Sequence, residues 1–302
     1  MNALQGGIAV ITGAASGFGL EACRIAARQG MKVVMADVQA DALDTASREI
    51  QGLGAAVLAR RTDVSKAAEI EALAEATLAR FGTPSFVFNN AGVTGSGGLV
   101  WENSLKDWEW TLGVNLMGVV HGVRVFTPLM LAAAAKDPAW RGHVVNTASM
   151  AGLTCPPTMG IYNTSKHAVV ALSETLHQDL TLVTSQVHAH VLCPFFVPTG
   201  IHTSHRNRPA ELTDAAPLTR SQRVAQAMGE KAISGGKVTA AQVAQFVFDA
   251  MAECRFYVFS HPHALSSVQT RLEDVMQRRN PSDPFAARPQ LGEQLRAALR
   301  GD

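Results

Sequence analysis

The stretch IAVITGAASGFG, which runs from Ile8 to Gly19, decides the fold of this chain. Ile8–Thr12 is a short apolar run that predicts a buried strand, and residues 20–29 are helix formers that end before Gly30, where glycine commonly terminates a helix. The glycine-rich turn between them would let backbone N–H groups approach a phosphate at the helix N-terminus. Alone, such a turn is as often an ordinary turn, but its place between a strand and a helix favours phosphate binding.

Strand-like and helix-like segments alternate from this stretch to Cys193. Because the central strand segments are apolar on both faces, we expect a parallel sheet covered by helices on both sides. The sequence therefore predicts an α/β fold of the Rossmann type, a doubly wound parallel sheet in a single domain. The further predicted strands are Lys32–Asp37, 54–60, Phe86–Asn89, 143–147 and Val187–Cys193, and the predicted helices are 41–51, 65–81 with Ser65 as its cap, 105–131 and 161–182.

The alternation breaks after Pro194. Residues 196–220 are rich in Pro, Thr, His and Asn without a sustained period, and they are too many for an ordinary connection, so we expect a substrate lid. The later segments predict a helix over 239–251 capped by Thr239, a short strand Tyr257–Phe259, a helix over 264–279 and a tail over 281–302. The expected division is a core for cofactor binding and catalysis over 1–195, a lid over 196–235 and a C-terminal region over 236–302.

Composition argues against several classes of protein. With 26 Lys and Arg against 25 Asp and Glu, the chain has no charge excess that would favour nucleic acid as a partner. The four cysteines show no CxxC spacing and suit a reducing cytosol. No signal peptide and no uninterrupted run of ~18 apolar residues is visible, so we expect a soluble cytoplasmic protein with no membrane partner.

Asp37 ends the second predicted strand, near the ~20-residue offset at which an acidic residue meets the adenosine ribose of a dinucleotide. A carboxylate there can accept hydrogen bonds from both ribose hydroxyls and repels a 2′-phosphate, for which Val38 offers no cation. Both residues favour NAD over NADP. The alternative is that Asp37 only caps the next helix.

Tyr162 and Lys166 lie four residues apart at the start of a predicted helix, so they share one helical face. A free tyrosine has a pKa near 10, and an ammonium group within ~4–6 Å favours the phenolate and lowers that pKa. The spacing therefore predicts a tyrosine activated for proton transfer, although ordinary solvated helix faces also contain this pattern.

Polar residues follow the ends of the fourth and fifth predicted strands, at the edge where open α/β sheets bind ligands. Ser149 lies after the fifth strand, where it could hold a substrate oxygen beside Tyr162, and Asn89–Gly92 ends the fourth. Asn115 interrupts an apolar helix in which asparagine is a poor former, which indicates a buried hydrogen-bonding task. Each of these residues alone is also explained as a turn former or a satisfied polar group.

Taken together, these motifs resemble the short-chain dehydrogenase/reductase family, in its single-domain branch. They occur in family order and spacing over about two-thirds of the chain, from Ile8 to Thr199. The matching motifs are Thr12–Gly19, Asp37, Asp63–Val64, Asn89–Gly92, Asn115, Ser149, Tyr162–Lys166 and Pro194 with Thr199.

The resemblance implies roles for the catalytic residues. Tyr162 would be the general acid/base, Lys166 would lower its pKa and bind the nicotinamide ribose, and Ser149 would orient the substrate oxygen. Asn115 would hold a water in a proton relay behind Lys166. The NAD-binding residues that the resemblance implies, besides Tyr162 and Lys166, are Gly13, Ser16, Gly17, Phe18, Gly19, Asp37, Asp63, Val64, Asn89, Ala91, Gly92, Val197 and Thr199.

Two residues depart from the family pattern. Phe195 follows Pro194 where glycine is usual, which would change the backbone near the nicotinamide and place aromatic bulk close to the substrate. Phe18 replaces an aliphatic residue in the glycine loop, which we interpret as a packing change. The run RFYVFSHP over 255–262 resembles a subgroup with a long C-terminal extension, some of whose members oxidise aromatic or bulky alcohols.

The function that the resemblance implies is an NAD(H)-dependent alcohol dehydrogenase or carbonyl reductase. It would interconvert a secondary alcohol and a ketone, with a small-molecule substrate that is bulky or aromatic, as a homodimer or homotetramer. Two alternatives stay open: an NAD(H)-sensing regulator, which would be expected to have lost Tyr, Lys or Ser, and a nucleotide-sugar epimerase or dehydratase, whose glycine loop is spaced differently. We expect no metal site, because nothing in the sequence brings His202, His205, His261 and His263 together.

Overall fold

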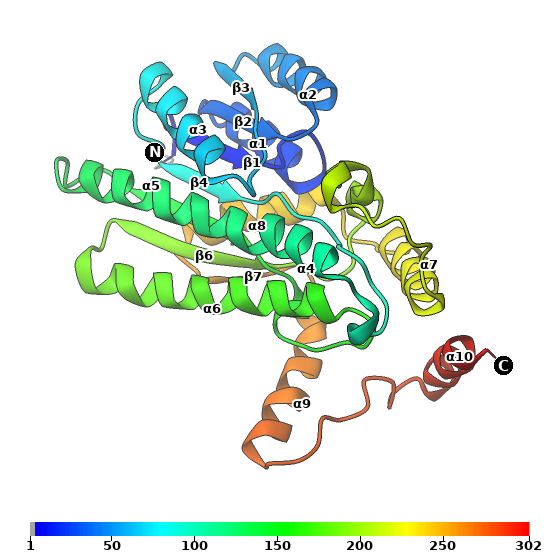
Figure 1. Ribbon diagram of the computed structural model, residues 1–302. Helices are drawn as coiled ribbons and strands as arrows, with labels where there is room; N and C mark the ends of the chain where they lie inside the picture. The colour runs from blue at the N-terminus through cyan, green and yellow to red at the C-terminus, as the bar shows by residue number, and fades with distance from the viewer. Residues whose placement is uncertain (1–3, 302) are drawn as a thin grey trace.

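A seven-stranded, fully parallel sheet forms the centre of the molecule, with strand order β3-β2-β1-β4-β5-β6-β7. The structure is a computed structural model that describes residues 4–301 (Figure 1). The predicted doubly wound parallel sheet in a single domain is confirmed. The strands are β1 Ile8–Thr12, β2 Lys32–Asp37, β3 Val57–Arg61, β4 Phe86–Asn89, β5 Gly142–Thr147, β6 Val187–Cys193 and β7 Tyr257–Phe259.

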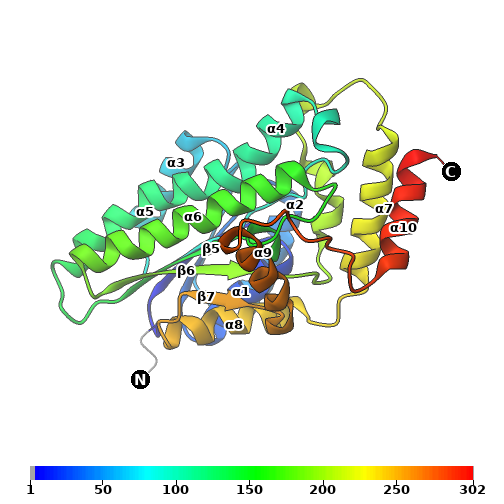
Figure 2. The ribbon, with the colours of Figure 1, turned by 90° about the horizontal axis from the view of Figure 1, so that it is seen from below.

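Helices cover both faces of this sheet, as Figure 2 shows for α5 and α6 on one side and α1 and α8 on the other. Successive strand residues point to opposite faces, so Ile11 and Met35 are buried under one helical layer and Val10 and Val34 under the other. The α-helices are α1 Gly17–Arg28, α2 Ala40–Gly52, α3 Ala67–Arg80, α4 Leu105–Leu112, α5 Gly118–Ala134, α6 Gly160–Val183, α7 Arg220–Ser234, α8 Ala240–Ala252, α9 Leu265–Met276 and α10 Pro289–Arg300.

The strand order reverses between β1 and β4, which lie side by side although α1 to α3 separate them in the chain. Connections leave in opposite directions at this point and open a crevice at the carboxyl ends of the strands. The residues that follow β1, β2, β4, β5 and β6 therefore meet along one edge of the sheet.

Two helix caps were predicted, and one of the predictions is wrong. Thr239 caps α8 as expected, since its side chain accepts a hydrogen bond from the backbone N–H of Gln242. Ser65 does not cap α3, whose N-cap is Lys66 without a side-chain bond. The Ser65 hydroxyl instead donates to the carboxylate of Asp63 at 2.7 Å, because that acceptor lies only two residues away.

The region after Pro194 is more regular than its composition predicts. The segment expected to be irregular holds two 3₁₀ helices, Gly200–Asn207 and Ala210–Leu212, and α7 follows within the predicted lid. The segment expected to be a tail contains α10, which packs against α7. Both α7 and α10 bury few residues.

The continuous helical run Leu105–Ala134 is long and apolar enough to cross a membrane by length and composition. Charged residues interrupt it, so it contains no uninterrupted apolar run of the length that a membrane helix needs. A core helix of a soluble protein passes the same test. Here α5 packs on β4 and β5 and against α3. Its Arg124 forms an ion pair with Glu71 of α3 at 2.5 Å, so this run is an integral layer of the α/β domain.

Candidate active site

The glycine loop turns tightly between β1 and α1. Gly13 and Gly17 have φ angles of +64° and +54°, which side-chain-bearing residues rarely adopt. A Cβ on Gly19 would lie 2.1 Å from the carbonyl oxygen of Gly13, so only glycine fits there. The Ser16 side chain makes no capping bond to α1. The first-turn N–H groups of α1 are therefore available to an anion.

Asn90 and Thr12 fix this loop, and neither was assigned a role from the sequence. The Asn90 side-chain amide donates to the carbonyl of Thr12 at 3.0 Å. The Thr12 hydroxyl accepts from the backbone N–H groups of Asn90 and Ala91 at 2.9 and 3.1 Å. A Cβ on Gly13 would lie 3.0 Å from the Cα of Ala91, which shows how closely the two segments pass. The adjacent polar residues at the ends of β1 and β4 were the available signal.

Asp37 lies beside the loop and has a structural task of its own. One carboxylate oxygen accepts from the backbone N–H of Ala15 and the other from that of Gln39, each at 3.0 Å. The N-cap of α2 is Gln39, so Asp37 does not cap that helix. Each carboxylate oxygen has a second lone pair, which leaves Asp37 able to accept further hydrogen bonds.

Asp63 and Val64 follow β3 on the same edge. One Asp63 carboxylate oxygen accepts from the backbone N–H and the hydroxyl of Ser65, at 3.0 and 2.7 Å. Val64 is 6% exposed, and its side chain packs on Gly118, where an added Cβ would lie 2.7 Å away. Within residues 4–301, the other Asp63 carboxylate oxygen thus has no hydrogen-bond donor, whereas Val64 is largely enclosed.

The side chain of Asn89 does not face the crevice that it was expected to line. Its amide donates to Asn146 of β5 at 2.9 Å, and Asn146 donates to Ser173 of α6 at 3.0 Å. A Cβ on Gly122 would collide with Asn89. Asn89 is the last residue of β4, and its side chain points into the core. These buried amides therefore connect the sheet to α5 and α6.

Asn115 lies fully buried in a π-helical turn, Gly113–Met117, between α4 and α5. Its side-chain oxygen accepts from the N–H of Val93 at 2.8 Å. Its amide donates to the carbonyl of Val93 at 3.0 Å and to Ser165 at 3.2 Å. A π-helical turn is rare and commonly marks a functional site. Asn115 therefore fixes the segment after β4 against the start of α6.

Ser149, Tyr162 and Lys166 come together at the carboxyl edge of β5. The Ser149 hydroxyl donates to the carbonyl of Pro194 at 3.3 Å, and it lies close enough to Tyr162 to act on the pKa of its phenol. Lys166 Nζ lies 5.7 Å from the centroid of the Tyr162 ring and donates to the carbonyl of Thr147 at 2.8 Å. A Cβ on Gly92 would lie 3.7 Å from Lys166 Nζ, so the lysine passes directly beside the segment after β4.

Burial dominates the ionisation of both helix residues. It raises the pKa of Tyr162, and the nearby Ser149 hydroxyl acts in the opposite direction. Burial also lowers the pKa of Lys166 to about 8. The lowered tyrosine pKa expected from the Tyr-to-Lys spacing is therefore absent, because Lys166 is itself desolvated and its ammonium is directed to a backbone carbonyl.

The segment after β6 carries Phe195 in place of the expected glycine. Its backbone N–H donates to Ser260 at 2.9 Å, and its ring contacts those of Phe196 and His261 at centroid distances of 4.6 and 5.8 Å. Val197 is buried, and the Thr199 side chain lies 3.5 Å from where a Cβ on Gly17 would be. Phe18 packs on the core beneath the loop, as its interpretation as a packing change predicts.

The predicted lid is tied to α4 and the preceding loop. Arg208 forms an ion pair with Asp107 at 2.6 Å, and their side chains are 14% and 4% exposed. The Arg208 guanidinium also lies 5.3 Å from the ring centroid of Trp110. Burial acts to raise the pKa of Asp107, but hydrogen bonds from Ser96, the backbone of Ser104 and Arg208 together lower it.

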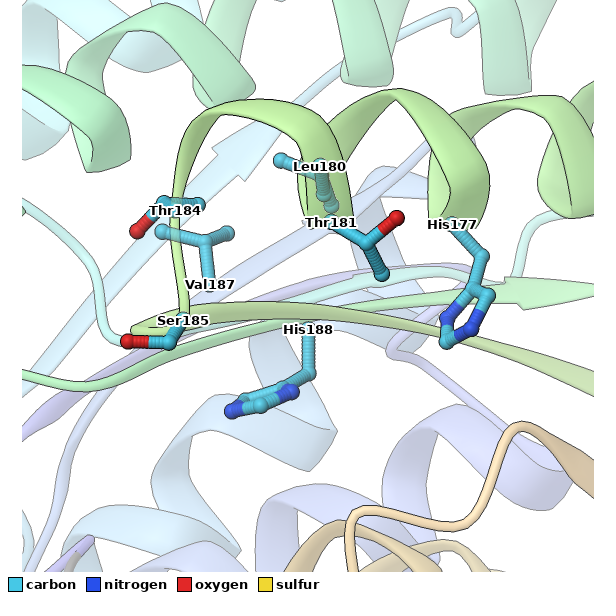
Figure 3. A pocket seen from close by; sticks show the side chains of 7 residues that line it. All are labelled: His177, Leu180, Thr181, Thr184, Ser185, Val187 and His188. Carbon is cyan, nitrogen blue, oxygen red and sulfur yellow. The ribbon is translucent and has the colours of Figure 1, made fainter.

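A surface cavity of about 280 Å³ lies between the end of α6 and the start of β6 (Figure 3). Its lining includes His177 of α6 and His188 of β6. This cavity opens near the amino end of β6, whereas Ser149 and Tyr162 lie at the carboxyl edge of the sheet. It is therefore separate from the candidate active site.

Comparison with known proteins identifies the family. The family model for short chain dehydrogenases matches residues 7–210. A short-chain dehydrogenase/reductase from Burkholderia phymatum, solved in complex with NAD, is 49% identical with a TM-score of 0.91, covering 95% of this chain and all of that one. The chain belongs to the short-chain dehydrogenase/reductase family of oxidoreductases.

Two curated relatives match over most of their length. A CLA biosynthesis dehydrogenase/reductase from Lactiplantibacillus plantarum is 33% identical over 269 residues, 88% of this chain and 92% of that protein. A 1-deoxy-11-beta-hydroxypentalenate dehydrogenase from Streptomyces avermitilis is 33% identical over 272 residues, 90% of this chain and 89% of that protein.

Proposed function

We propose that this protein is an NAD(H)-dependent dehydrogenase/reductase that interconverts a secondary alcohol and a ketone, with Tyr162 as the general acid/base. The observation that carries the proposal is the convergence of Ser149, Tyr162 and Lys166 at the carboxyl edge of β5, where Lys166 Nζ lies 5.7 Å from the centroid of the Tyr162 ring and donates to the carbonyl of Thr147 at 2.8 Å. The hydroxypentalenate dehydrogenase relative supports an alcohol substrate.

The residues fit a dinucleotide cofactor. The glycine loop leaves the first-turn N–H groups of α1 free for phosphates, and Asp37 retains acceptor capacity for ribose hydroxyls. The NAD complex of the Burkholderia phymatum structure supports the choice of cofactor. When bound, the nicotinamide would supply the hydride acceptor, or the hydride donor in the reverse direction.

The chain's own residues handle the proton. Ser149 would orient the substrate oxygen toward Tyr162, whose phenol oxygen exchanges the hydroxyl proton. Lys166 would hold a ribose hydroxyl and pass the proton onward, and Asn115 would position the relay by fixing the segment after β4. The raised pKa of Tyr162 makes it a proton donor in ketone reduction. In alcohol oxidation the positive charge of the oxidised nicotinamide would favour the phenolate.

Removing the phenol oxygen tests this assignment. Tyr162→Phe should reduce kcat by about 10²–10⁴-fold, the usual contribution of a general acid/base, while NAD binding survives. Turnover is followed by the absorbance of reduced nicotinamide with a panel of alcohols and ketones, and binding by titration. The matched control is Tyr257→Phe, at the only other tyrosine, whose hydroxyl donates to Glu174 at 2.6 Å on β7.

Tyr257→Phe should keep near-native turnover. Near-native activity of Tyr162→Phe would refute the mechanism. Tight NAD binding without turnover of any substrate by the native protein would favour the alternative of a cofactor-sensing regulator.

The substrate is proposed to be bulky and apolar. Phe195 and Phe196 are in tilted ring contact just after the carboxyl end of β6, next to His261, and put aromatic surface beside the candidate site. Aromatic secondary alcohols should therefore give a higher kcat/KM than ethanol and 2-propanol, because a large apolar pocket gains little from a short alcohol. The reverse order would count against such a pocket.

The protein is further proposed to be a cytoplasmic homodimer or homotetramer with no nucleic-acid or membrane partner. Exposed apolar side chains at the end of α6, Leu182 and Val183, and on α9, Val275 and Met276, support contact with a second copy. Light scattering on the purified protein measures the mass, and a monomer would refute this assembly.

A further inference from the structure

A thiol and an imidazole meet on the outer side of α6, away from the proton-transfer residues. Cys155 is exposed, and its Sγ lies 3.8 Å from Nε2 of His167. His167 directly follows Lys166 in the chain, but Lys166 is buried toward the sheet. The proposed hydride transfer uses neither Cys155 nor His167.

The hydrogen bonds of His167 fix its tautomer. Nδ1 lies 2.9 Å from the carbonyl oxygen of Asn163, which can only accept, so Nδ1 carries the hydrogen. Nε2 therefore presents a lone pair to the thiol of Cys155. An imidazole held in this way by a third group is the arrangement that activates nucleophilic thiols.

Asn163 holds both members of the pair in place. Its side-chain amide donates to the carbonyl of Pro156, the residue after Cys155, at 2.8 Å, while its backbone carbonyl binds His167. Its side-chain oxygen is buried and has no hydrogen-bond partner within residues 4–301. An unsatisfied buried acceptor is costly unless a donor reaches it.

A cavity of about 380 Å³ borders the imidazole, between α6, β7 and α9. Its walls are mostly apolar, and they include His167, Glu174, Tyr257 and Arg271. Glu174 accepts from Tyr257, whereas Arg271 of α9 has no ion pair or hydrogen bond in the described part of the chain. An unpaired guanidinium at an apolar cavity suits a ligand that carries a carboxylate.

We propose that Cys155 is a reactive thiol, assisted by His167, that forms a mixed disulfide with a low-molecular-weight disulfide bearing carboxylates. Nε2 of His167 takes the thiol proton as Sγ attacks one sulfur of that disulfide. The bond between Sγ and this sulfur forms while the disulfide's own S–S bond breaks. The departing thiolate takes the proton from His167, so the incoming disulfide is the only oxidant.

The chain provides an internal comparison for the thiol. Cys254 is also exposed, but no imidazole contacts it in the described residues, and Cys23 and Cys193 are buried. A free thiol with a pKa near 8.5 is only ~3% thiolate at pH 7. A neighbouring base that removes the thiol proton can therefore increase the rate of disulfide exchange about tenfold. The probe is glutathione disulfide at pH 7, and peptide mass spectrometry measures the labelling rate at each cysteine.

Cys155 should react about tenfold faster than Cys254, and His167→Gln should remove that advantage. Arg271→Gln should slow the labelling of Cys155 by glutathione disulfide a few-fold, because one exposed ion pair contributes about that much to binding. The same variant should leave labelling by the cationic disulfide cystamine unchanged. His177→Gln, on the same helix, is the matched control and should change neither rate.

Equal rates at Cys155 and Cys254 in the native protein would overturn the proposal, and this comparison needs no variant. A His167→Gln protein with the native Cys155 rate would overturn it as well. Neither readout depends on turnover, so the reactive thiol and the proposed dehydrogenase activity can fail separately.

Discussion

At the residue scale, the proposed preference for NAD over NADP depends on Asp37. Its carboxylate accepts hydrogen bonds from two backbone N–H groups, and its negative charge would repel the 2′-phosphate of NADP. The native protein should therefore have a higher kcat/KM with NAD than with NADP. Asp37→Ser combined with Val38→Arg should shift the ratio toward NADP by about 10–100-fold, the equivalent of one charge-assisted hydrogen bond.

The control for this shift is Val38→Arg alone, which adds the cation but keeps the carboxylate and its bonds to the glycine loop. It should change the ratio less than the double variant does. Initial rates with NAD and with NADP give the kcat/KM ratio for the native protein, the double variant and Val38→Arg. A native preference for NADP would refute the role given to Asp37.

Single positions also show what residue patterns can and cannot predict. Asn89 and Asn90 are adjacent at the end of β4, and the sequence analysis predicted that Asn89 lines the cofactor crevice. In the structure Asn89 bonds within the core, while Asn90 holds the loop. The strand register decides which of two neighbours points inward, and a one-residue offset exchanges their roles. The residue types identified the edge of the sheet, but not the direction of each side chain.

At the element scale, the central strands were predictable because β1, β2, β4, β5 and β6 are almost completely buried in a parallel sheet. The elements after Pro194 were not, because α7 and α10 bury few residues and pack mainly on each other. Contact between the two helices stabilises them, and the sequence of either helix alone does not show that contact.

The lid gives a prediction about motion. Its ties to the core include the Arg208–Asp107 ion pair and the hydrogen bonds from Thr219 and Ser221 to Glu102, both 2.6 Å. If the lid gates the substrate, hydrogen exchange over residues 201–220 should be faster in the free protein than in the ternary complex with cofactor and substrate. Equal protection in both states would mean a permanently packed loop.

Arg208→Ala tests the same element by mutation. It leaves Asp107 buried without its ion-pair partner, so exchange over residues 201–220 should rise and KM for the substrate should increase. Arg223→Ala is the control, because Arg223 is exposed on α7 and, among the residues that the structure describes, its side chain donates to the carbonyl of Leu218 and forms no ion pair. A lid whose exchange is unchanged by Arg208→Ala would show that the ion pair does not hold it.

At the scale of the whole molecule, two buried histidines join the sheet strands. His143 of β5 lies 3.0 Å from His190 of β6 through Nδ1 and Nε2, and His190 Nδ1 lies 2.8 Å from the carbonyl of Arg255. The carbonyl must accept, so His190 donates through Nδ1 and accepts from His143 through Nε2. Protonation at Nε2 of His190 would place two N–H groups face to face.

Burial keeps both imidazoles neutral in the folded protein. It lowers the pKa of His143 to about 3 and that of His190 to about 4, and the nearby His188 acts in the same direction at both. In the unfolded chain both titrate near pH 6.5. Below that pH the unfolded state binds protons that the folded state does not, so the free energy of unfolding falls as the pH falls from about 6.5 toward 4.

The expected decrease in the free energy of unfolding at acid pH is substantial. Each group contributes up to about 1.4 kcal/mol per pH unit, so the two together should remove on the order of 3 kcal/mol between pH 6.5 and pH 5. Urea unfolding at a series of pH values measures this slope. His143→Gln with His190→Gln should flatten it, whereas His205→Gln, at an exposed lid position, should not. A slope that the double variant leaves unchanged would mean that carboxylates elsewhere, and not this pair, set the acid limit of the fold.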